Sequence, residues 1–169
     1  MQPFLRIVAA LVAVPLMLLG QSAAKQPGKQ IKLTAAQIEA YLAAQPEVIA
    51  VQRKIIMGER SGSDPAVAAD IEGAVTKHGL RDTKEYSDVL STIILVINRI
   101  DPQTRALRNT QGEIRKQIAE VTADKSLAAK DKKRRLKDLN DALKGERPIE
   151  HPSNVDLVLK YFDKIRATL

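Results

Sequence analysis

Neither cysteine nor tryptophan occurs in this 169-residue sequence, and aromatic residues make up only 3% of it. The absence of cysteine excludes a disulfide scaffold, a lipid-modified cysteine, thiol chemistry and a cysteine metal site. Because so few aromatic side chains are present, a hydrophobic core has to be built from Ile, Val, Leu and Ala. The composition therefore predicts a protein stabilised by aliphatic packing alone.

Histidine is also scarce, which limits both metal binding and catalysis. His78 and His151 are the only two, and neither lies in an HExxH or His-x-His pattern. His78 is expected in the last turn of a helix, where an imidazolium interacts favourably with the helix dipole. Ser61-Gly62-Ser63 lacks the Gly-x-Ser-x-Gly spacing of a nucleophilic serine. We expect no metal site and no cofactor.

Two pairs of carboxylates are spaced so that they could act as a general acid and base: Asp82 with Glu85, and Asp124 with Asp131. Each of these residues already suits a helix cap or a solvated surface. We therefore expect no catalytic residue and a protein that is not an enzyme.

The first 24 residues have the organisation of a secretory signal. Residues 7–19 are thirteen in number and apolar apart from Pro15, and Ser22-Ala23-Ala24 supplies the small residues that a signal peptidase reads. A membrane-spanning helix needs about 20 apolar residues. We predict a cleaved signal peptide over residues 1–24 and a periplasmic protein that begins at Lys25, followed by a flexible leader over residues 25–32. An uncleaved anchor is the alternative.

The most apolar stretch of the remaining chain is Tyr86–Ile100. Its apolar residues recur at three- and four-residue steps, which places them on one helical face. The run Thr92-Ile93-Ile94 would also suit a strand, but no other stretch offers that strand a partner. We predict that this segment is the central helix of an all-α domain.

Capping signals divide residues 33–169 into about six helices, which we expect to form one small helical bundle. Thr34 with Gln37, Asp64-Pro65, Asp82 with Glu85, Thr110 with Glu113, Ser126, and Ser153 with Asp156 are the expected helix starts. The expected breaks are a kink or restart at Pro46, a loop over residues 58–63, a left-handed cap at Gly79, a short helical turn over residues 101–109, a turn over residues 123–126, and an extended segment over residues 145–152.

A dense run of positive charge occupies the second of two helices that we expect to form an antiparallel hairpin. The narrow apolar stripes of these helices suffice for one neighbour each, which leaves the remaining surface solvated. The candidate binding patch consists of Lys130, Lys132, Lys133, Arg134, Arg135 and Lys137. Such a patch suits acidic proteins or anionic envelope components. The alternative is a solvated helix face with no binding role. Nucleic acid is not expected, because the secretory signal separates the chain from it and the patch has no aromatic residue for base stacking.

The sequence Leu33-Thr34-Ala35-Ala36-Gln37 resembles the LTxxQ motif of the small periplasmic helical proteins of the Spy- and CpxP-like family. The resemblance covers Leu33, Thr34 and Gln37, and a second copy of the motif is absent. It implies a role in envelope stress, as a client-binding chaperone or as the regulator of a sensor kinase. The stretches His78-Gly79-Leu80 and Asp101-Pro102-Gln103-Thr104 are similar to those of uncharacterised periplasmic proteins from α-proteobacteria.

Two functional hypotheses follow. The first is a non-enzymatic periplasmic protein that binds other macromolecules, such as unfolded or acidic proteins, as a chaperone or envelope-stress accessory. The second is a module that docks on anionic lipid, lipopolysaccharide or cell wall through its basic helix face. A concave apolar surface would favour the first, and a one-sided basic face beside a closed core would favour the second.

Overall fold

The computed structural model describes residues 29–169, and its regular structure is helical throughout this range apart from one isolated bridge between Ile100 and Leu107. The seven helices of the described range are α1 (Ala35–Ile56), α2 (Pro65–Lys77), α3 (Thr83–Ile97), α4 (Thr110–Ala123), α5 (Ala129–Gly145), α6 (Ser153–Lys160) and α7 (Phe162–Thr168). The all-α prediction is confirmed. The predicted signal peptide over residues 1–24 lies outside the described residues.

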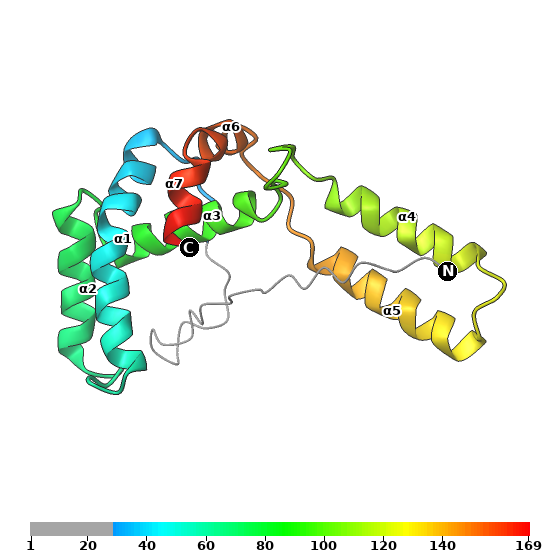
Figure 1. The fold of residues 1–169 in the computed structure, drawn as a ribbon, viewed down its shortest axis with the longest axis horizontal. Coiled ribbons are helices and arrows are strands. Elements are labelled where there is room, and N and C mark those ends of the chain that lie inside the picture. The colour runs from blue at the N-terminus through cyan, green and yellow to red at the C-terminus, as the bar shows by residue number, and fades with distance from the viewer. Residues whose placement is uncertain (1–28) are drawn as a thin grey trace.

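Five of the helices form a body around one aliphatic core. In Figure 1, α1 and α2 lie side by side, α3 passes behind them, and α6 and α7 cover the remaining side. Helix α3 contacts α1, α2 and α6. The fully buried side chains of α3 include Val89, Ile93 and Val96, none of which has any exposed surface. The prediction of a central helix is confirmed, although the helix runs over Thr83–Ile97 and ends before Ile100.

The helix starts that depend on local capping chemistry agree with the sequence prediction. Thr34 and Gln37 form a capping box, in which each side chain bonds the backbone of the other residue. Asp64 caps α2 with Pro65 in its first turn, and Asp82 caps α3 by accepting from the Glu85 N–H at 2.6 Å. Gly79 has φ +93°, which is the predicted left-handed conformation after α2.

Two other predictions agree with the structure only in part. Of the two alternatives predicted at Pro46, the restart is wrong, because Pro46 lies inside the continuous helix α1, and the kink stays a prediction. Residues 101–109 form a single helical turn and not a longer helix: the Arg105 N–H donates to Asp101 O at 2.8 Å, and the Asp101 carboxylate also accepts from the N–H groups of Gln103 and Thr104.

The starts of the last two predicted helices also differ from the prediction. Helix α5 starts at Ala129 without a side-chain cap, because Ser126 bonds Asp124 instead. Helix α6 starts at Ser153 after Pro152, again without a side-chain cap. The predicted final helix is divided at Tyr161, whose N–H donates to Val158 O three residues back.

The leader predicted to be flexible is held against the body over its described part, residues 29–32. Gln30 is 4% exposed, donates to Pro148 O and accepts from the Glu150 N–H. The fully buried Asn154 accepts from the Leu33 N–H at 2.9 Å and donates to Ile31 O at 2.8 Å. The Asn154 side chain thus supplies the hydrogen bonds that a neighbouring strand would give to this extended segment.

We expect Asn154→Ala to destabilise the protein by about 2–3 kcal/mol, because it leaves the N–H of Leu33 and the C=O of Ile31 buried without partners. Asn140→Ala is the control, because Asn140 is exposed and bonds only the carbonyl of Leu136 in its own helix. Urea denaturation followed by circular dichroism measures both. Equal midpoints for the two variants would show that Asn154 does not hold the leader.

Candidate functional site: the α4–α5 arm

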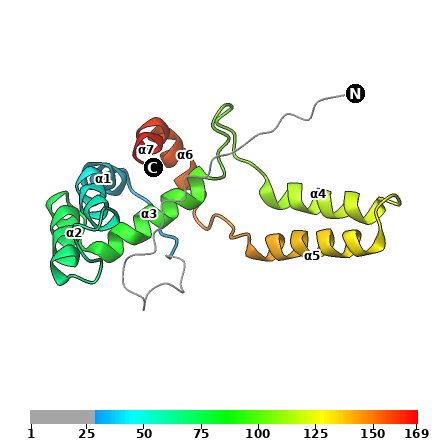
Figure 2. The same cartoon turned by 60° about the horizontal axis from the view of Figure 1, so that its bottom comes forward.

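Helices α4 and α5 form an arm, residues 110–145, that projects away from the body. Both views show the two helices antiparallel and side by side, beyond the end of α3 (Figures 1 and 2). No residue of either helix is buried. Seven aliphatic side chains along the contact between them are half-buried: Ile114, Ile118, Val121, Leu127, Leu136, Leu139 and Leu143. We call this line of residues the seam.

The arm carries most of the net charge of the described chain. It contains ten Lys or Arg residues and six Asp or Glu residues, which gives +4 over 36 residues. The other 105 described residues contain fifteen basic and fourteen acidic residues, which gives +1. The positive charge therefore lies on the part of the molecule that contributes no buried side chain.

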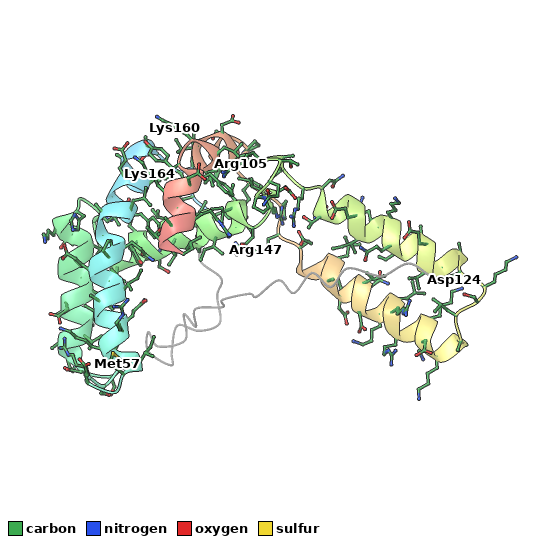
Figure 3. All side chains as sticks on the ribbon, in the orientation of Figure 1. Met57, Arg105, Asp124, Arg147, Lys160 and Lys164 are labelled. Carbon is green, nitrogen blue, oxygen red and sulfur yellow. The ribbon has the colours of Figure 1, made fainter. Side chains whose placement is uncertain are left out.

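A set of contacts fixes the root of the arm to the body. Arg99, two residues after α3, pairs with Glu146 at 2.6 Å and donates to the carbonyl of Arg147. Arg147 lies just after α5, where Figure 3 labels it. The guanidinium of Arg105 lies 3.8 Å from the ring centroid of Phe162 and pairs with Asp163. Both connections between arm and body are thus bonded to the body rather than extended freely.

A second loop contact lies beside this root. Arg108 pairs with Asp101 at 2.9 Å, and the N–H and guanidinium donors around Asp101 lower the pKa of its carboxyl group. An open depression of about 210 Å³ adjoins it, lined in part by Arg99, Arg108 and Ile149. Both arginines are already paired, so the depression offers no free cationic group from them.

The six residues of the predicted patch do not share one environment. Lys132 is half-buried and donates to Asp124 O at 2.9 Å, near the tip of the arm (Figure 3). Arg134 pairs with Asp131 at 3.0 Å, and Lys137 with Asp141 at 2.6 Å, which raises the pKa of Lys137. The others are exposed and have no ion pair within the described chain: Lys130, Lys133 and Arg135.

The helical repeat divides these charges between two faces of the arm. Successive residues on a helix are about 100° apart, so the seam fixes which flank each other residue occupies. Because the two helices are antiparallel, residues that follow the seam by about 100° of rotation on α4 and on α5 lie on the same side of the arm. Residues that precede it by about 100° lie on the opposite side. One side of the arm therefore carries basic side chains and no acidic ones, with Lys133 and Lys144 closer to the seam than Lys130 and Lys137. We call it the basic face, and its residues are Arg115, Lys130, Lys133, Lys137 and Lys144.

The opposite side carries mainly acidic residues, with one arginine among them: Glu113, Glu120, Asp131, Asp138 and Arg135. The predicted patch therefore contains three residues of the basic face, whereas Arg134 points outward and Arg135 lies on the opposite side. Arg115 and Lys144 belong to the face and were missed, because they lie outside the dense run of charge. Applying the helical repeat to both helices of the predicted hairpin would have found them.

The LTxxQ-like motif forms the start of α1. Leu33 and Ile38 are both buried on either side of the capping box, as a hydrophobic staple requires. Gln37 also donates to Glu85 at 2.7 Å and so joins α1 to α3. The motif therefore positions the start of α1 on the central helix.

The groups considered for catalysis are engaged in similar structural contacts. Asp82 and Glu85 accept backbone N–H groups, chiefly those of Glu85 and Arg81 respectively, and these bonds lower the pKa of both carboxyl groups. Asp124 accepts from Ser126, which lowers its pKa as well. His78 lies 2.8 Å from Glu47 in the half-buried end of α2. Within residues 29–169, no group of three or more His, Asp or Glu side chains could hold a metal ion.

No described helix is long and apolar enough to cross a membrane. Comparison with known proteins finds no matching family model, no matching curated protein and no matching solved structure. The resemblance to the LTxxQ proteins therefore stays a prediction.

Proposed function

We propose that this protein is a non-enzymatic binding protein of the periplasm, and that the α4–α5 arm is the element with which it binds an anionic macromolecule. The observation that carries the proposal is the arm itself. It orders 36 residues without burying one side chain, and it holds a net charge of +4 against +1 for the rest of the described chain. Ordering such a segment costs conformational entropy that its narrow seam recovers only in part. A contact with a partner would provide the missing burial.

The distribution of apolar surface favours a defined anionic partner over a general chaperone for unfolded chains. The large apolar side chains that are exposed are few within the described residues and lie in three separate segments: Ile56 with Met57, Leu107, and Leu169. A cradle for unfolded clients requires a contiguous apolar surface. The basic arm beside a closed core instead supports docking on an acidic protein or an anionic envelope surface.

The test is to neutralise the basic face and measure binding to anionic probes. We expect Lys130→Gln, Lys133→Gln, Lys137→Gln and Lys144→Gln together to weaken binding at least about tenfold at low salt, because they remove four of the arm's ten positive charges. The probes are vesicles that contain phosphatidylglycerol and an acidic polypeptide, poly-glutamate, each at low and moderate salt. The melting temperature should change little, since exposed charges contribute little to stability.

The control replaces four exposed lysines outside the arm by glutamine: Lys29, Lys32, Lys54 and Lys164. It has the same net charge as the arm variant. If both variants lose binding equally, the attraction comes from total charge and the arm is not the binding element. If neither loses binding, the basic face is a solvated surface.

A further inference from the structure

We propose that the partner of the arm is an acidic amphipathic helix of another protein, which packs along the seam between α4 and α5 on the basic face and completes a three-helix bundle. This inference rests on the proposed function, that the arm binds an anionic macromolecule. It adds the chemical class of the partner and the side of the arm to which it binds.

On this face, the contact line between the two helices is aliphatic and is flanked by basic side chains. The seven seam residues are all half-buried, because the apolar stripe of each helix is covered only by the facing helix. Two packed helices leave the sides of their seam open, and a third helix is the element that covers such a side in helical bundles. On the basic face, the seam lies between Arg115 on α4 and Lys133, Lys137 and Lys144 on α5.

This surface matches a helix with an apolar stripe flanked by Asp or Glu. The apolar side chains of such a helix would cover Ile118, Leu136 and Leu139, and its carboxylates would meet the basic side chains that flank the seam. Lys133 and Lys144 have no ion pair within the described residues, so both are available to such carboxylates without the loss of an internal pair. The opposite side of the arm would repel the same helix, because Glu113, Glu120, Asp131 and Asp138 lie there.

Charge excludes the two occupants that the chain itself could supply. Residues 1–28 contain Arg6 and Lys25 and no acidic residue, so they carry the same sign as the basic face. A second copy would present basic face to basic face in a two-fold dimer. Pairing a basic face with the acidic side of another arm is not two-fold symmetric, and it would build a ring or a filament rather than a dimer.

The arm is a poor match for a lipid surface. Its aliphatic residues point toward the facing helix, whereas a helix that lies on a membrane presents its apolar stripe outward. The arm has no Trp, Tyr or Phe, which are the residues that anchor such helices at the interface. A membrane would meet the flanking lysines and leave the seam uncovered.

The experiment compares two synthetic peptides of identical composition against the full mature chain. One peptide places leucines at helical spacing with glutamates on both flanks, and the other scrambles that order. We expect the ordered peptide to bind at least about tenfold more tightly, because only it can cover the seam and meet the basic side chains on both flanks. Lys133→Glu with Lys144→Glu should abolish its binding, whereas Lys116→Glu with Arg135→Glu, away from the basic face, should leave it within about twofold. Far-UV circular dichroism checks that both variants remain helical.

Several results would overturn the inference. If the two peptides bind equally, or if phosphatidylglycerol vesicles bind more tightly than the ordered peptide, the arm recognises charge alone and the proposed function still stands. If neither peptide nor vesicle binds the wild type, the proposed function fails as well. Concentration-dependent self-association of the wild type that is lost in the Lys133→Glu, Lys144→Glu variant would show that a second copy is the occupant.

Discussion

Ile93→Asp is expected to unfold most of the molecule under conditions in which the wild type is folded. Ile93 is fully buried in the middle of α3, the helix that contacts α1, α2 and α6. An aspartate there would lose its hydration without gaining a partner, which costs several kcal/mol. A domain of this size has only about 5–15 kcal/mol of stability in total.

The matched control is Ile56→Asp, because Ile56 is 67% exposed at the end of α1. We expect it to change the free energy of unfolding by no more than about 0.5 kcal/mol. Urea denaturation followed by circular dichroism measures both variants. Similar midpoints for the two would mean that α3 is not the centre of the core.

The features that could be predicted from the sequence are those that depend on residues close together in the chain. Thr34 with Gln37, Asp64 with Pro65, and Gly79 each determine a boundary by a contact within three or four residues, and these boundaries are confirmed. The spacing of apolar residues over 86–100 likewise identified the buried face of α3.

The features that were missed depend on residues distant in the chain. Asn154 holds the leader through bonds to Ile31 and Leu33, more than 120 residues away, and no local pattern indicates such a contact. Tyr161 ends α6 while its hydroxyl bonds Glu39 on α1 at 2.5 Å. Local capping preference also failed at Ser126, because Asp124 competed for the same side chain.

The candidate site was predicted in part. The narrow stripe at Leu136, Leu139 and Leu143 correctly predicted a helix with one neighbour and a solvated basic surface. The sequence did not indicate that the pair would leave the body altogether. That arrangement depends on contacts such as Arg99 with Glu146, which join residues 47 positions apart.

The second prediction with a large expected effect is that the arm can unfold without the body. Leu139→Asp places a charge in the middle of the seam, and we expect it to unfold α4 and α5 while the body stays folded. The seam joins only these two helices, and helices of this length are marginal without a packing partner. Circular dichroism should therefore show a loss of helix without a loss of the main unfolding transition. Ile93→Asp, by contrast, should remove that transition.

Native-state hydrogen exchange on the wild-type protein tests the separation of arm and body most directly. If the arm opens on its own, the amides of α4 and α5 should exchange at least about a hundredfold faster than those of the middle of α1 and α3, which corresponds to about 3 kcal/mol less protection. The ordered acidic peptide should slow exchange in residues 110–145 and leave α1 and α3 unchanged. Equal protection of α4, α5 and α3 in the free protein would contradict the account, because the arm would then unfold only together with the core.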